Sequence, residues 1–226
     1  MTEHRFDTRN EASAEAATRI AELLEYRLQH QARASFVISG GSSPLECFGA
    51  LANTTLDWDR VDVLLSDERW VPPDHADSNE KLAREALLVD KASEAQLQPV
   101  YTEGVSPEQR CDDLQDPLPV LPFSCSLIGM GSDGHFASLF PDADNLDAGL
   151  DVESGRLYIP VATAASPHPR VSMTLAAISR SDEIVLLFFG EEKLAIYEQA
   201  RADANGFPVS KLLRQKRAPV RVFWAP

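Results

Sequence analysis

Apolar runs typical of β-strands alternate along this sequence with segments of helical periodicity. Strands are predicted at 36–38, 61–65, 99–101, 123–128, 157–161, 184–189 and 220–223, and helices at 10–30, 45–51, 78–88, 107–114, 171–178 and 192–200. Strands that alternate with helices pair in parallel through crossover connections, so helices cover the sheet on both faces. We therefore predict an α/β fold with a mostly parallel sheet between two layers of helices.

Length and composition indicate a globular chain with an ordinary core. Of its 226 residues, 44% are hydrophobic and 25% charged, and no linker or repeat divides the sequence, so we expect a single domain over 1–226. The N-terminal ten residues lack the apolar core of a signal peptide, and the longest apolar run, 184–189, is too short to span a bilayer. Three scattered cysteines suit neither a disulfide framework nor a zinc knuckle. A reduced, cytoplasmic protein is the expectation.

The formal net charge of -14 argues against nucleic acids and anionic membranes as partners. It leaves room for a small anionic substrate, because a pocket needs only a few local cations. Arg69, Arg170 and Lys193 follow or flank predicted strands and are available for that purpose. Ligands of such sheets bind beyond the carboxyl ends of the strands, and the reactive side chains of this sequence cluster there.

The segment Ser39–Pro44 follows the first predicted strand and leads into a helix. Its two glycines and three serines offer backbone amides and hydroxyl groups, which suit a phosphate group, and the serines can also cap the helix. The spacing is not that of a Walker motif, and the lysine is missing. An ordinary glycine-serine turn remains the alternative.

The segment Gly129–Pro141 follows the strand at 123–128, and we expect it to open a short helix-like stretch. Its glycines allow close approach of a ligand, and Asp133 lies two residues before His135. A carboxylate at that spacing can orient the imidazole and leave its other nitrogen free to take a proton. The G-x-G-x-x-G spacing also matches the dinucleotide fingerprint, but no full helix or later acid follows as that site requires. A structural role for His135 in capping a turn is the other interpretation.

Acids and histidines elsewhere raise the question of a metal ion. A metal site built from these side chains is conceivable, but its spacing matches no known ligand pattern: Asp67, His75, Asp77, Asp133 and His135. We therefore predict no metal and no cofactor. A serine nucleophile is also unsupported, because the sequence contains no G-x-S-x-G motif.

Four blocks of the sequence together resemble the 6-phosphogluconolactonase family. The blocks are Ser39–Pro44, Asp67–Pro72 with His75 and Ser78-Asn79, Gly129–Pro141, and Pro169-Arg170-Val171. They occur in the family's order and cover most of the chain, with Ser43 where the family more often has threonine. The resemblance implies a modified Rossmann-type fold, related to glucosamine-6-phosphate deaminase and ribose-5-phosphate isomerase.

The activity implied by this resemblance is hydrolysis of 6-phospho-D-glucono-1,5-lactone to 6-phospho-D-gluconate in the oxidative pentose phosphate pathway. His135, oriented by Asp133, would activate water, Arg69 would stabilise the oxyanion or hold a sugar hydroxyl, and Asp67 would position hydroxyls or Arg69. The phosphate would be held by Gly40, Gly41, Ser42, Ser43, Arg170 and Lys193. Lys193 rests on a shorter match, and a surface lysine is nearly as good an interpretation.

Two other functions compete with the lactonase. Glucosamine-6-phosphate deaminases carry an Asn-Glu-Pro end where this chain has Leu139-Phe140-Pro141, so the carboxylate that partners ring opening is missing. A non-catalytic sugar-phosphate sensor would normally carry a DNA-binding module, for which this chain has neither spare length nor a basic face. The expected partner is therefore a small-molecule substrate, and the oligomeric state is not predicted.

Overall fold

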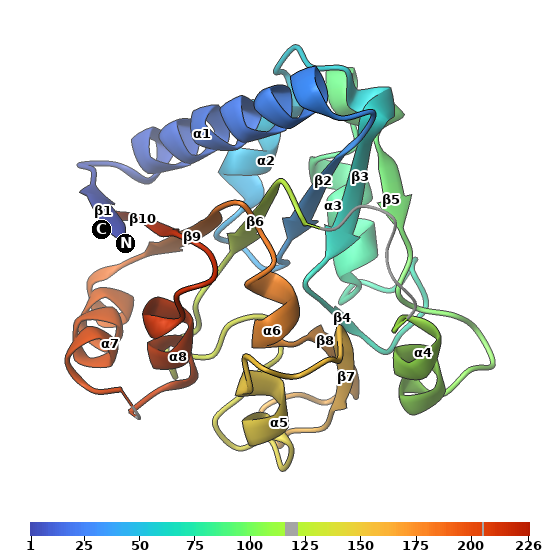
Figure 1. Cartoon of the computed structure of the whole chain (residues 1–226), viewed down its shortest axis with the longest axis vertical. Helices are drawn as coiled ribbons and strands as arrows, with labels where there is room; N and C mark the ends of the chain where they lie inside the picture. The colour runs from blue at the N-terminus through green and yellow to red at the C-terminus, as the bar shows by residue number, and fades with distance from the viewer. Residues whose placement is uncertain (116–121, 205) are drawn as a thin grey trace.

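The computed structural model describes residues 1–115, 122–204 and 206–226 (Figure 1). Its main sheet has seven strands in the order β1-β10-β9-β6-β2-β3-β5, and all neighbouring strands are parallel. The strands are β1 (Thr2–Arg5), β2 (Ala34–Ile38), β3 (Val61–Leu65), β5 (Gln96–Gln98), β6 (Cys125–Ile128), β9 (Ile184–Phe189) and β10 (Val220–Ala225). The prediction of a mostly parallel α/β sheet is confirmed.

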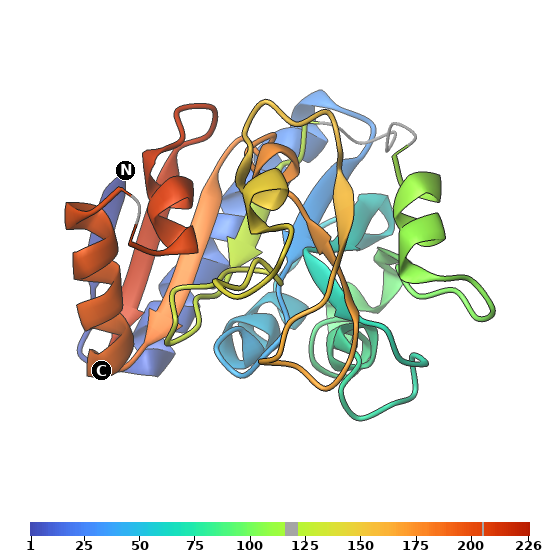
Figure 2. The same ribbon diagram turned by 90° about the horizontal axis from the view of Figure 1, so that it is seen from below.

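Helices lie on both faces of this sheet. The long helix α1 (Arg9–His30) begins at a capping box between Thr8 and Glu11 and runs along one face, while α7 and α8 lie on the opposite face (Figures 1 and 2). The remaining helices are α2 (Leu45–Ala52), α3 (Asn79–Ala86), α4 (Pro107–Asp113), α5 (Leu146–Leu150), α6 (Leu175–Ile178), α7 (Glu191–Ala202) and α8 (Pro208–Arg214), with 3-10 turns at Trp58–Arg60 and Asp90–Glu94. Among the described residues, no helix is long and apolar enough to cross a membrane.

A second, antiparallel sheet was not predicted. It has the order β4-β8-β7 and consists of β4 (Asp67–Arg69), β8 (Arg170–Met173) and β7 (Tyr158–Val161). The helix predicted at 171–178 is therefore wrong in its first half. Thr174 is extended and caps the short helix α6 through its side chain, so the helix begins only at Leu175. The first half of the predicted helix is a strand, β8, because it pairs with β4 and β7.

Other differences have local causes. The weak strand expected at 99–101 lies at 96–98 as β5. The helix-like stretch expected after Gly129 is instead a series of turns, in which Gly131 N donates to His135 O at 2.9 Å. The strand β1 was missed because it is an edge strand with three of its four residues exposed, whereas β2, β3 and β6 are buried throughout.

Candidate active site

A pocket of about 230 Å³ lies at the carboxyl ends of the parallel strands, as expected for this class of sheet. The loops after β2 and β6 reach it, as does the first turn of the helix that follows β9, and the small antiparallel sheet forms its other side. Nine of the ten predicted site residues line it: Gly40, Gly41, Ser42, Ser43, Asp67, Arg69, His135, Arg170 and Lys193. The tenth, Asp133, is not among the lining residues but is hydrogen-bonded to one of them, His135.

The loop 39–43 after β2 turns sharply into the pocket. Gly41 adopts a φ of +88°, which a side chain rarely tolerates, and a Cβ on Gly40 would lie 1.9 Å from Asn79 Oδ1. Helix α2 begins after Pro44 without a side-chain cap, so the expected capping role of the serines is wrong. Ser42 and Ser43 line the pocket instead. The loop thus offers amides and hydroxyls to a ligand rather than to its own helix.

His135 is held by Asp133 and by its own backbone. Its Nδ1 donates to Asp133 Oδ1 at 2.5 Å, and its backbone N donates to the same oxygen at 3.1 Å. Burial alone would raise the pKa of Asp133, but these hydrogen bonds outweigh it and lower that pKa. Because the proton on Nδ1 is held in this hydrogen bond to the carboxylate, Nε2 is the nitrogen left to accept a proton, and it has no hydrogen-bond partner among the described residues.

The surroundings of His135 leave the imidazole little freedom. A Cβ on Gly131 would lie 2.3 Å from the ring, so this position requires glycine. On another side the ring packs against Phe140 with 4.2 Å between centroids. Only 5% of Phe140 is exposed, so the residue in place of the deaminase glutamate is an apolar wall against the histidine.

Asp67 pairs with Arg170 and not with Arg69, contrary to one of the two predicted roles. Asp67 Oδ2 accepts a hydrogen bond from Ser138 Oγ at 2.5 Å and one from Arg170 Nη1 at 3.5 Å. Arg170 also donates from Nε to Ser166 Oγ at 3.0 Å. Burial lowers the pKa of Arg170, although the neighbouring Asp67 carboxylate works in the opposite direction. The guanidinium is thus already partly removed from water, which strengthens its attraction for an anion.

Arg69 is anchored through one nitrogen of its guanidinium group. Its Nη1 donates to the backbone carbonyl of Asp77 at 2.6 Å, and its buried Nε has no partner. Its neighbour Glu68 is fully buried and accepts from Ser78 Oγ and from the amides of Asn79 and Glu80. Glu68 therefore stabilises the start of α3 and lies outside the pocket lining.

Sequence reasoning missed other residues of the pocket lining. Asn79 donates from Nδ2 to the Asp67 carbonyl at 2.8 Å, and its buried Oδ1 has no partner. The signal for it was present, since Asn79 belongs to one of the recognised blocks. Ala137 also lines the pocket, at a φ of +48° that is unusual for a residue with a side chain. Ser39, Gly129, Met130 and Gly131 complete the lining.

Lys193 lies in the first turn of α7 and lines the pocket, so it is not simply a surface lysine. Burial lowers the pKa of its ammonium group. With Arg69 and Arg170 it places three cationic side chains around a pocket in a chain of net charge -14. This concentration of positive charge beside a loop of free amides and hydroxyls favours an anionic ligand.

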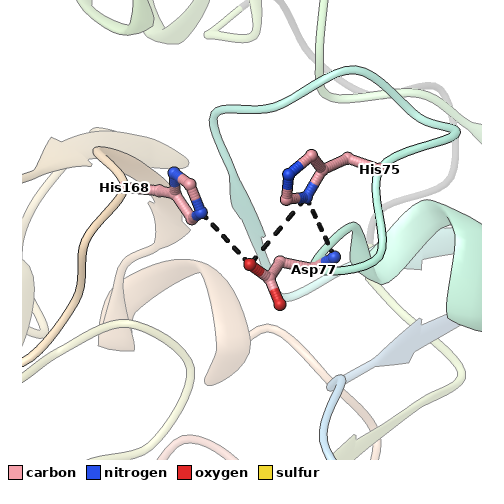
Figure 3. Close-up of side chains that lie close together, drawn as sticks. All are labelled: His75, Asp77 and His168. Carbon is pink, nitrogen blue, oxygen red and sulfur yellow. Dashed lines mark hydrogen bonds and ion pairs between the residues drawn. The ribbon is translucent and has the colours of Figure 1, made fainter.

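The metal-binding set considered from the sequence does not form among the described residues. Asp67 and His135 line the pocket, whereas His75 and Asp77 gather with His168 (Figure 3). His168 was not considered as a ligand from the sequence.

Comparisons with known proteins identify the family of the chain. The family profile described as Glucosamine-6-phosphate isomerases/6-phosphogluconolactonase matches residues 7–224. The chain is 39% identical to the 6-phosphogluconolactonase of Caulobacter vibrioides over 97% of this chain and 95% of the relative, and 35% identical to that of Neisseria meningitidis serogroup A over 98% of both. The crystal structure of a 6-phosphogluconolactonase from Shewanella baltica superposes with a TM-score of 0.94 at 35% identity, covering 100% of this chain and 98% of the other. The chain therefore belongs to the glucosamine-6-phosphate isomerase/6-phosphogluconolactonase family.

Proposed function

We propose that this protein is a lactonase that hydrolyses 6-phospho-D-glucono-1,5-lactone to 6-phospho-D-gluconate in the oxidative pentose phosphate pathway. The observation that carries the proposal is the Asp133–His135 pair, whose 2.5 Å contact leaves the second imidazole nitrogen free beside an anion-binding pocket. The names of the full-length relatives support the same reaction.

In the proposed reaction His135 acts first as a base and then as an acid. Nε2 takes a proton from water, and the resulting hydroxide oxygen forms a bond to the lactone carbonyl carbon. The bond between that carbon and the ring oxygen then breaks, and the imidazolium returns the proton to the departing oxygen. Asp133 stabilises the imidazolium between the two steps, because its carboxylate stays ionised at neutral pH.

The cations and the glycine-serine loop would bind the phosphate group and stabilise the developing negative charge. Gly40, Gly41, Ser42 and Ser43 would hold the phosphate oxygens through amides and hydroxyls, with Arg170 and Lys193 supplying charge. Arg69 would stabilise the carbonyl oxygen as negative charge develops there, since its guanidinium group lines the pocket. Asp67 would act indirectly, by holding Arg170 in place.

Deamination of glucosamine 6-phosphate is less favoured by the site. Ring opening in that reaction uses a carboxylate next to the histidine, and here the buried Phe140 packs on His135 instead. A sensor without turnover would not need a histidine whose tautomer is held by a carboxylate. Lactone hydrolysis is the function that gives a role to every charged group of the pocket.

The direct test follows lactone disappearance by NMR, using freshly generated substrate and the spontaneous hydrolysis as a blank. A parallel sample with glucosamine 6-phosphate is assayed for ammonia. Acceleration in the first sample alone, without added metal, supports the lactonase. Ammonia in the second would favour the deaminase, and binding of sugar phosphates without turnover in either would favour the sensor.

We further propose that residues 1–226 work as one domain in a reducing cytoplasm, without nucleic acid as a partner. The free, buried thiols of Cys47, Cys111 and Cys125 and the net charge of -14 support this. Cell fractionation with immunodetection tests the location, and recovery of the protein in an oxidising compartment would contradict it.

A further inference from the structure

Two histidines and an aspartate gather outside the pocket, where loop 72–78 meets loop 162–169 (Figure 3). His168 Nε2 lies 3.1 Å from Asp77 Oδ2, and His75 Nδ1 lies 3.8 Å from the same oxygen. The two imidazoles meet edge to face with 5.4 Å between centroids. The carboxylate thus stands between two rings that come from segments far apart in the sequence.

The spacing of these atoms fits a single ion. The three ligand atoms all lie within 4.8 Å of one another. Zinc binds nitrogen and oxygen ligands at about 2.0–2.2 Å, so two ligands of a tetrahedral ion lie roughly 3.3 Å apart. The observed distances of 3.1 and 3.8 Å lie on either side of that value. Small rotations of side chains that are 28 to 53% exposed would complete the geometry.

We propose that His75, Asp77 and His168 bind a divalent transition-metal ion of the zinc class. Imidazole nitrogen favours zinc, copper and nickel, whereas magnesium and calcium prefer all-oxygen sites. Three protein ligands leave a fourth position for water. The Asp77 amide already donates to His75 Nδ1 at 3.1 Å, and an ion at that nitrogen would replace this bond. We therefore expect micromolar rather than tighter affinity.

Such an ion would join the two loops that hold the pocket arginines. The Asp77 carbonyl accepts from Arg69, and Ser166 Oγ accepts from Arg170 while donating to the His168 carbonyl at 3.1 Å. The loops are already linked by the contact of His168 Nε2 with Asp77 Oδ2 at 3.1 Å and, just before loop 72–78, by a backbone bond from Trp70 N to Pro169 O at 2.8 Å. A bound ion would add His75 to this contact and so hold both loops, and through them both guanidinium groups, more rigidly.

The test measures metal binding directly, so it is independent of any turnover. Zinc is titrated into the full chain by calorimetry, and cobalt is followed by its visible absorption, which reports coordination geometry. The variants are His168→Ala and, as a matched control, His30→Ala, an exposed histidine in the last turn of α1. Magnesium is titrated in parallel.

We expect one zinc per chain with micromolar affinity, at least about tenfold weaker binding in His168→Ala, and no change in His30→Ala. Undiminished binding in His168→Ala would assign the ion elsewhere, for example to the Asp133–His135 pair, and overturn the proposal. Equal affinity for magnesium, or no zinc binding at all, would overturn it too. Circular dichroism checks that the variants fold.

Hydrogen exchange then tests the link between the loops. Zinc should slow amide exchange severalfold in 72–78 and 162–169 of the natural sequence, and not in His168→Ala. Slowing confined to 72–78 would mean that the ion does not bridge the loops, and would contradict that part of the proposal.

Discussion

The pocket has two walls that are built in opposite ways. The glycine wall consists of loops 39–43 and 129–135, which follow the parallel strands β2 and β6. The ionic wall consists of Asp67, Arg69 and Arg170 on the antiparallel pair β4 and β8. The first presents backbone amides, hydroxyls and one imidazole, and the second presents charges tied into a buried network.

The two walls differ in how their groups are fixed in place before a ligand binds. In the glycine wall small residues let the backbone turn toward the ligand, and little side-chain freedom is lost. In the ionic wall Ser138, Ser166 and Asp67 hold Arg170 while burial removes water from it. We infer that the glycine wall carries the base His135, whereas Arg170 of the ionic wall supplies more of the affinity for an anion than the uncharged donors of the glycine wall do.

The largest effect should come from His135, the proposed base of the glycine wall. His135→Ala removes the proposed base, and we expect kcat to fall about 10²- to 10⁴-fold while binding of 6-phosphogluconate stays nearly unchanged. Lactone hydrolysis and calorimetry measure the two quantities, with His30→Ala as the control. An equal loss of binding and turnover would indicate that His135 has a structural role.

A second pair of variants compares the affinity carried by each wall. Arg170→Met removes charge-assisted contacts, and we expect binding of 6-phosphogluconate to weaken about 10- to 100-fold. Ser42→Ala removes one uncharged hydroxyl donor and should weaken binding of 6-phosphogluconate about fivefold. Calorimetry measures both, with Arg156→Met as a control, since Arg156 pairs with Asp112 on an exposed surface. A larger loss in Ser42→Ala than in Arg170→Met would reverse the assignment of the walls.

The glycine wall could be predicted from the sequence, because local chain order determines it. Buried parallel strands are mostly apolar, so β3 and β9 were predicted with their observed limits. The loops after such strands fall at one edge of the sheet. Asp133 and His135 are two residues apart, so their contact needs only a turn. These features can be predicted without knowledge of the tertiary structure.

The ionic wall could not be predicted in the same way. Strand β4 is Asp67-Glu68-Arg69, which carries no hydrophobic pattern, and β8 is a strand only because β4 and β7 pair with it. The partner of Asp67 depends on that pairing, which sets Arg69 opposite Arg170. Likewise Asn79 reaches the pocket only because Glu68 holds the start of α3. Long-range pairing decides all of these contacts.

A third pair of variants tests whether two glycines of the glycine wall, Gly40 and Gly129, differ in their importance for stability. Gly40→Ala would place a Cβ 1.9 Å from Asn79 Oδ1, and we expect the free energy of unfolding to fall by about 1–3 kcal/mol. Gly129→Ala is the matched control, because no atom beyond its chain neighbours lies within 4 Å of its added Cβ, and it should change stability by less than about 0.5 kcal/mol. Urea unfolding measures both. Equal stability of the two variants would show that Asn79 yields freely.

The smallest effect concerns the charge of Asp133, whose side chain is 42% exposed. Its pKa is lowered from 3.8 in the folded chain, because the hydrogen bonds from His135 outweigh the effect of burial. A carboxylate with a lowered pKa stabilises the fold above its unfolded pKa, and this contribution disappears as the pH falls through the folded value.

Asp133→Asn should therefore be less stable than the natural sequence at pH 7, by no more than about 1 kcal/mol because solvent screens the pair. The difference should shrink as the pH falls below 3.8 and vanish once the pH lies below the folded pKa of Asp133, where both side chains are neutral. Urea unfolding across this range measures the difference. A gap that stays constant at acid pH would mean that Asp133 acts through shape rather than charge, and the glycine wall would then contain no side chain whose charge matters to the fold.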